Sequence, residues 1–131
     1  GMLAAARRDA QLYLLPGEPA ALDWLAKQPV DGAVVALPRS SAFIPARSNH
    51  PVYYGHPMET LDAKRKEAEV RALFAGERSD LLRRPDVGWL YFGPYERDRA
   101  APALLETLVN LEVAYQRAGV TIYCTRDRRD R

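Results

Sequence analysis

The sequence predicts an α/β fold: a mixed sheet with a parallel centre and an antiparallel C-terminal hairpin, with helices packed on it in a three-layer-like arrangement. The continuous apolar run Gly32–Leu37 is typical of a strand covered on both faces and is the expected centre of the sheet, and Val87–Phe92 predicts a further strand. Between them, Leu61–Ala75 carries apolar residues at helical spacing. Near the C-terminus, Leu111–Tyr115 and Val120–Cys124 flank a glycine and predict a β-hairpin.

The remaining elements follow from turn residues and apolar spacing. They are a strand at Gln11–Leu15, a helix from Glu18 that ends before Pro29, a strand at Val52–Tyr54, a short helix at Ser79–Leu82 and a helix at Ala103–Leu108. Thr60 is the expected N-cap of the middle helix, and Gly76 stands where its C-terminus favours glycine. The stretch from Pro38 to Pro51 is expected to be an irregular connection.

Length and charge limit the class of protein. A chain of 131 residues has the usual size of one domain with one core. We expect an N-terminal extension at residues 1–10, a single α/β domain at 11–125 and a charged tail at 126–131. Nineteen basic and seventeen acidic residues are interleaved and leave a net charge of +2, so nucleic acid is not an expected partner.

Short motifs with a known mechanism are absent from the sequence. There is no G-x-S-x-G elbow, no glycine-rich phosphate loop, no C-x-x-C pair and no H-E-x-x-H, so we expect no catalytic residue, metal or cofactor. Cys124 lies in an apolar run and is interpreted as a core residue. No apolar run approaches the ~20 residues that a membrane-spanning helix requires.

Polar residues follow the three predicted parallel strands and form one candidate ligand site. Arg39 follows the first strand, His56 and Glu59 follow the second, and Tyr95 and Arg97 follow the third. Since the carboxyl ends of parallel strands present their loops to a common crevice, these side chains are expected to form a polar ligand cup. One histidine with one glutamate falls short of a zinc site.

The same residues also have purely structural interpretations. His56 would hold a turn, Glu59 would favour the start of a helix, and Glu96 with Arg97 would be a solvent-exposed pair. A small hydrolase or transferase would need Asp62, Glu59 and His56 to act together, and their spacing does not require this. The structural interpretation and the ligand cup therefore both stay open at this point.

An ordered series of segments carries a family resemblance. The series is Ala21–Leu25, Gly32–Leu37, Ile44–Arg47, Val52–Thr60, Lys64, Phe74, Trp89–Arg97 and Val120–Tyr123. In this order the segments resemble the soluble C-terminal domain of bacterial multi-spanning glycosyltransferase-like, or mannosyltransferase-like, integral membrane proteins. The resemblance covers most of the chain, from about Ala20 to Tyr123, and its most specific parts are Gly55–Thr60 and Gly93–Arg97.

The resemblance implies a domain that follows the last transmembrane helix on the extracytoplasmic face, where such enzymes use lipid-linked sugars. Catalytic carboxylates of that class belong to the membrane part. We therefore expect a non-catalytic accessory domain that packs against a membrane-embedded region or helps present a lipid-linked sugar or acceptor. The alternative is an independent small-molecule-binding module that uses the strand-end crevice, and a stand-alone chain of this kind would be cytoplasmic.

Overall fold

The fold comes from a computed structural model that describes residues 13–55 and 62–126. Its α-helices are α2 (Glu18–Ala26), α3 (Pro38–Ser41), α4 (Ile44–Ser48), α5 (Ala63–Phe74), α6 (Pro94–Arg97) and α7 (Pro102–Leu108), with a 3₁₀-helix η1 at Ser79–Arg83. Its strands are β1 (Ala33–Val35), β2 (Val87–Phe92), β3 (Glu112–Arg117) and β4 (Val120–Cys124).

The four strands form one mixed sheet in the order β1-β2-β4-β3. β1 and β2 are parallel, whereas β4 pairs antiparallel with both β2 and β3. The hairpin between β3 and β4 turns through Ala118 and Gly119, both with positive φ, which suits a two-residue turn. The predicted parallel centre with an antiparallel C-terminal hairpin is confirmed.

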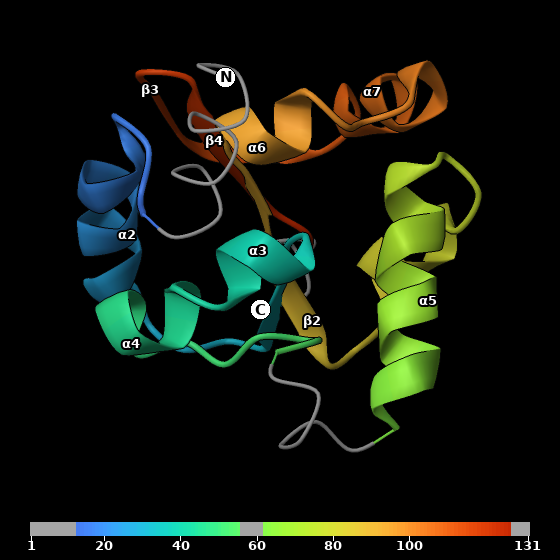
Figure 1. The fold of residues 1–131 in the computed structure, drawn as a ribbon, viewed down its shortest axis with the longest axis horizontal. Helices are drawn as coiled ribbons and strands as arrows, with labels where there is room; N and C mark the ends of the chain where they lie inside the picture. Colours follow the sequence, from blue (N-terminus) through green and yellow to red (C-terminus); the bar gives the residue numbers. More distant parts are fainter. Residues whose placement is uncertain (1–12, 56–61, 127–131) are drawn as a thin grey trace, which may run out of the picture.

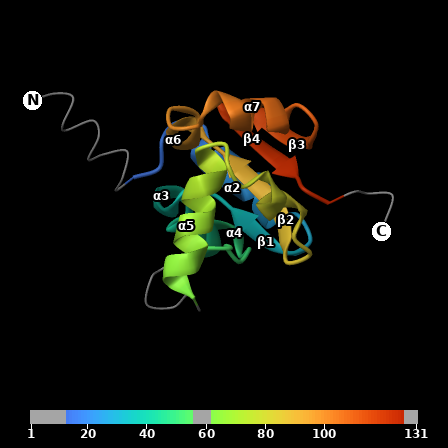
Figure 2. The ribbon, with the colours of Figure 1, turned by 90° about the vertical axis from the view of Figure 1, so that its right-hand side faces the viewer.

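Helices cover both faces of the sheet, as Figures 1 and 2 show, with α2 and α4 on one side and α5 on the other. Successive residues of β2 point to opposite faces, so Trp89 and Tyr91 pack with α2 while Leu90 and Phe92 pack with α5. Every residue of β2 is buried. The chain therefore builds two apolar layers that share one sheet, and the expected three-layer arrangement is confirmed.

Three sequence-based assignments are wrong. The described part of the first expected strand, Tyr13–Leu15, forms no strand, and Val52–Tyr54 contributes a single parallel bridge between Val52 and Val34 rather than a full strand. The connection after β1 is not irregular, because it contains α3 and α4. A third short helix, α6, follows β2 and was not predicted either.

Proline explains why these short helices were missed. Each of α3, α4 and α6 has a proline in its first turn. Proline reads as a strand breaker, yet its fixed φ also suits the first turn of a helix, where its missing N–H costs nothing. At Pro38 and Pro94 the residue that signals the end of a strand therefore also begins the next helix.

The ends of α5 are set by residues in left-handed backbone conformations. Asp62 precedes the helix with φ 57°, and Gly76 follows it with φ 87°. The predicted C-terminal glycine is confirmed, whereas Thr60, the predicted N-cap, lies outside the described residues.

Arg126, predicted as the first residue of the charged tail, forms an ion pair with Asp31 at 3.0 Å.

Among the helices in the described ranges, none has the length and apolar character to cross a bilayer.

Candidate functional site

The carboxyl ends of β1 and β2 lie side by side and place two predicted site residues together. Pro38 begins α3 directly after β1, and Pro94 begins α6 directly after β2. As a result the Arg39 guanidinium lies 5.4 Å from the centre of the Tyr95 ring. The expectation that the turns at positions 39 and 95 share one rim of the sheet is confirmed.

Most of the third predicted turn lies outside the described residues. The bridge from Val52 to Val34 sets its strand-like segment beside β1, in parallel orientation. His56 and Glu59, which follow that segment, lie outside the described residues.

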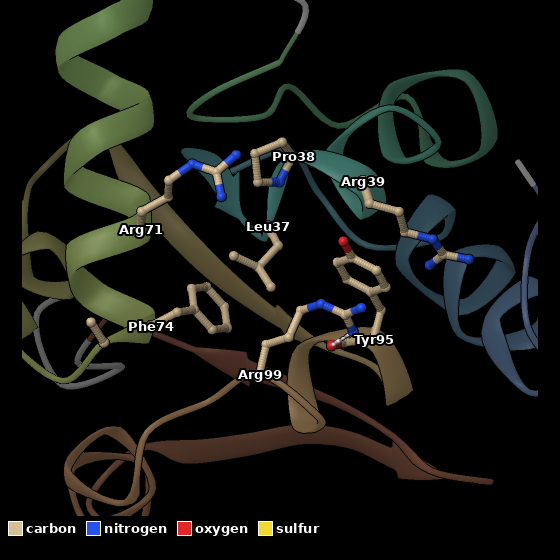
Figure 3. A pocket seen from close by; sticks show the side chains of 8 residues that line it. Leu37, Pro38, Arg39, Arg71, Phe74, Tyr95 and Arg99 are labelled. Atoms are coloured by element: carbon tan, nitrogen blue, oxygen red, sulfur yellow. Dashed lines mark hydrogen bonds between the residues drawn. The ribbon is translucent and has the colours of Figure 1, made fainter. Parts of the chain in front are cut away.

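A pocket of about 360 Å³ opens at this rim, between α5 and the starts of α3 and α6 (Figure 3). We call it the strand-end pocket. Its lining residues are Leu37, Pro38, Arg39, Arg71, Phe74, Ala75, Tyr95 and Arg99. Leu37 and Phe74 are buried core residues, so they form an apolar floor below the charged groups.

Arg71 of α5 and Arg99, which lies beyond α6, both line this hollow; Figure 3 shows the Arg71 guanidinium beside Pro38 and the Arg99 guanidinium against the Tyr95 ring. The Arg99 guanidinium stacks 3.6 Å from the Tyr95 ring centre, and its Nη1 donates to the Tyr95 carbonyl at 3.1 Å. Arg71 donates to the Glu67 carboxylate at 2.8 Å. Because that ion pair is largely exposed, it contributes about 0–1 kcal/mol and can yield to a bound anion.

The lining residues have a strongly one-sided charge. Besides four apolar residues, the described lining contains three arginines and the Tyr95 phenol, with no carboxylate, imidazole or thiol. A planar guanidinium donates two parallel hydrogen bonds to a phosphate or a carboxylate. The strand-end pocket is therefore suited to an anionic ligand and carries no acid–base or nucleophilic pair in its lining.

Arg39 lines the pocket with its side chain but does not direct its charge into it. Figure 3 shows its guanidinium pointing away from the hollow. That group is buried and donates to both carboxylate oxygens of Glu18, at 2.7 and 3.0 Å, while the Tyr91 hydroxyl donates to the same carboxylate. It lies 5.2 Å from the centre of the Phe43 ring and 5.4 Å from the centre of the Tyr95 ring. Arg39 thus positions the Tyr95 wall.

Arg97 is directed elsewhere. Its guanidinium lies 5.1 Å from the centre of the Phe92 ring, and Arg97 does not line the strand-end pocket. The two-residue offset from Tyr95 on a short helix is enough to move it off the pocket wall.

The interpretation of Glu96 as half of an exposed ion pair is wrong, because Glu96 has 0% exposure. Its carboxylate accepts from the Gly93 N–H and the Leu37 N–H, both at 3.2 Å, and hydrogen-bonds with the Ser40 hydroxyl. Burial, assisted by the nearby Glu18 carboxylate, raises the pKa of Glu96 to about 7. The signal for this role was its place three residues after Gly93, which is the spacing of a capping box.

Sequence reasoning also missed Arg71, Arg99 and the apolar floor. Arg71 belongs to a helix whose position over the sheet depends on its apolar face, and no local motif marks that residue.

The described residues contain no group of three or more histidine, cysteine or acidic side chains that could hold a metal ion. In comparisons with known proteins, no family model matches the chain and no curated protein matches significantly.

Proposed function

We propose that this domain is a non-catalytic binding module that takes a small anionic molecule, one carrying a phosphate or carboxylate group, in the strand-end pocket. The observation that supports this proposal is that Arg71 and Arg99 line one hollow in which no carboxylate is found among the described lining residues. Hydrogen bonds between a guanidinium and an anion are among the stronger ones in proteins.

The size and lining of the pocket limit the class of ligand that fits it. A volume of about 360 Å³ is at the small end of the range for small-molecule sites, roughly 300–1,000 Å³. Leu37 and Phe74 offer an apolar floor, and the Tyr95 ring offers a stacking surface beside it. The best match is a ligand with one anionic group and a compact less polar part.

The family resemblance suggests where such a ligand would come from. An accessory domain of a membrane glycosyltransferase-like protein would meet lipid-linked sugars, whose phosphate is the kind of anion that two arginines bind. An independent module would instead take a water-soluble phosphate or carboxylate. Both sources share the anionic group, so they are separated by experiment rather than by the pocket chemistry.

The test is isothermal titration with three phosphates: inorganic phosphate, glucose 1-phosphate and a short-chain polyprenyl phosphate, with neutral glucose as the uncharged comparison. We expect the phosphates to bind and glucose to fail. Arg71→Gln and Arg99→Gln should each weaken phosphate binding about tenfold or more, because each removes a charge-assisted contact.

The matched control is Arg47→Gln, since Arg47 is an exposed arginine, 3.9 Å from Asp23, outside the pocket. The phosphate affinity of Arg47→Gln should equal that of the unmodified protein. Tighter binding of the polyprenyl phosphate would favour the accessory domain, and tighter binding of glucose 1-phosphate would favour the independent module. The proposal is lost if no phosphate binds, or if the pocket variants bind as well as Arg47→Gln.

A further inference from the structure

One buried carboxylate connects the two loops that shape the strand-end pocket. Glu96 Oε2 accepts from the Leu37 N–H of the loop after β1, and Oε1 accepts from the Gly93 N–H of the loop after β2, both at 3.2 Å. The Ser40 hydroxyl of α3 hydrogen-bonds with the same carboxylate. Leu37, whose N–H makes one of these contacts, and Tyr95, which precedes Glu96 in the chain, both line the pocket. The carboxylate therefore lies directly behind the pocket wall.

The groups around Glu96 leave its charge poorly compensated. From α2 it faces the Glu18 carboxylate, and from β2 the Tyr91 hydroxyl, which donates to Glu18. Arg39 of α3, a cation of the same cluster, forms its ion pair with Glu18 rather than with Glu96. No ion pair among the described residues includes Glu96, and its carboxylate is hydrogen-bonded by the Ser40 hydroxyl and by the backbone N–H groups of Leu37, Gly93 and Glu96 itself. On its own helix, Arg97 is directed to the Phe92 ring.

A negative charge at this place opposes the binding of an anion on the other side of the wall. Two like charges within the protein interior repel more strongly than in water, because the effective dielectric constant is lower. A neutral Glu96 keeps its place in the wall, since its carbonyl oxygen still accepts a hydrogen bond. Protonation therefore removes the repulsion without removing all of the contacts that position the loops.

We infer that anion binding in the strand-end pocket is coupled to protonation of Glu96, so that the pocket holds an anion more tightly when this carboxyl is neutral. The inference rests on the proposed function and adds its regulation. Thermodynamic linkage requires the converse, that a bound anion draws a proton onto the domain. Burial raises the pKa of Glu96 to about 7, which places the coupling in the neutral range.

The test uses sulfate, because sulfate stays a dianion through the neutral range and phosphate does not. Between about pH 6 and about pH 8 the sulfate affinity of the unmodified domain should fall about two- to fivefold, the part of a coupling of roughly half to one pK unit that titrates within this window. Glu96→Gln should bind sulfate with little pH dependence, near the affinity that the unmodified domain shows at the acid end. Glu106→Gln, the same change at an exposed position on α7, should keep the full pH dependence.

A second measurement needs no variant. Titrating sulfate near neutral pH in two buffers with different heats of ionisation should report a net uptake of protons by the unmodified domain. Sulfate binding with no pH dependence and no proton uptake, or equal pH dependence in Glu96→Gln and Glu106→Gln, would overturn the coupling and leave the anion site standing. Failure of sulfate to bind at every pH would overturn both.

Discussion

The buried ion pair between Arg39 and Glu18 gives a sharp test of how the pocket wall is held. The two side chains are 3% and 1% exposed, and their closest nitrogen–oxygen distance is 2.7 Å. Arg39→Met removes the cation and leaves the Glu18 carboxylate with the Leu15 N–H, at 2.8 Å, and the Tyr91 hydroxyl as donors. An uncompensated buried charge of this kind costs about 3–5 kcal/mol.

This cost translates into a measurable shift in melting temperature. For a domain of this length about 1 kcal/mol corresponds to roughly 3–5 °C, so Arg39→Met should lower the midpoint by about 10–20 °C. The double variant Glu18→Gln with Arg39→Met removes both charges. It should be more stable than Arg39→Met alone, because the amide no longer carries an unpaired charge in the interior.

Thermal and urea unfolding followed by circular dichroism measure both quantities. The reasoning is refuted if Arg39→Met costs less than about 1 kcal/mol, the value expected of an exposed pair. It is also refuted if Glu18→Gln deepens the loss caused by Arg39→Met instead of relieving it.

Three further predictions concern stability. Because the pKa of Glu96 is about 7 in the folded state against an ordinary 4.5, the folded state binds more protons between these values, and the free energy of unfolding should fall with rising pH across that window. The fall in the free energy of unfolding amounts to about 3 kcal/mol at most, and urea unfolding of Glu96→Gln at several pH values should show that this pH dependence is lost. Gly88→Ala should disrupt folding, since the added Cβ would lie 1.6 Å from the Asp31 carbonyl oxygen. Gly119→Ala should cost only about 1 kcal/mol, because the nearest atom to its Cβ is 4.0 Å away and the strain comes from its φ of +81°. Equal melting temperatures of the two variants would contradict this. Leu90→Ala, at a position with 0% exposure, should cost about 2–5 kcal/mol in the same assay, and a cost below 1 would show a looser core.

Much of the fold could be predicted from local patterns because the relevant signals are local. The run Gly32–Leu37 contains β1, Val87–Phe92 became β2, and the glycine-containing turn became the β3–β4 hairpin. The run expected at the centre of the sheet is instead the first strand of the order β1-β2-β4-β3, and the fully buried strand inside it is β2. Gly76 ended α5 as expected, because glycine adopts positive φ without strain. Proline at the starts of α3 and α6 is compatible both with the end of a strand and with the start of a helix, so the local pattern did not predict these helices.

The candidate site was only partly predictable, since most of it depends on contacts between distant segments. Tyr95 lines the pocket because it follows a central parallel strand, and this relation can be read from the strand order. Arg71 reaches the same pocket only because α5 packs across the sheet face, and Arg39 turns its charge toward Glu18, 21 residues earlier in the chain. These pairings are set by packing, so no spacing in the sequence reveals them.

The most direct measurement of the anion site is a sulfate titration followed in amide ¹H–¹⁵N spectra of the isotope-labelled domain. The proposed site predicts saturable shifts concentrated at the pocket walls, in residues 37–39, 71–75 and 95–99, with residues of β3 unaffected. Saturable shifts that are scattered over the surface, or that remain at the pocket walls after both Arg71 and Arg99 are replaced by glutamine, would contradict it.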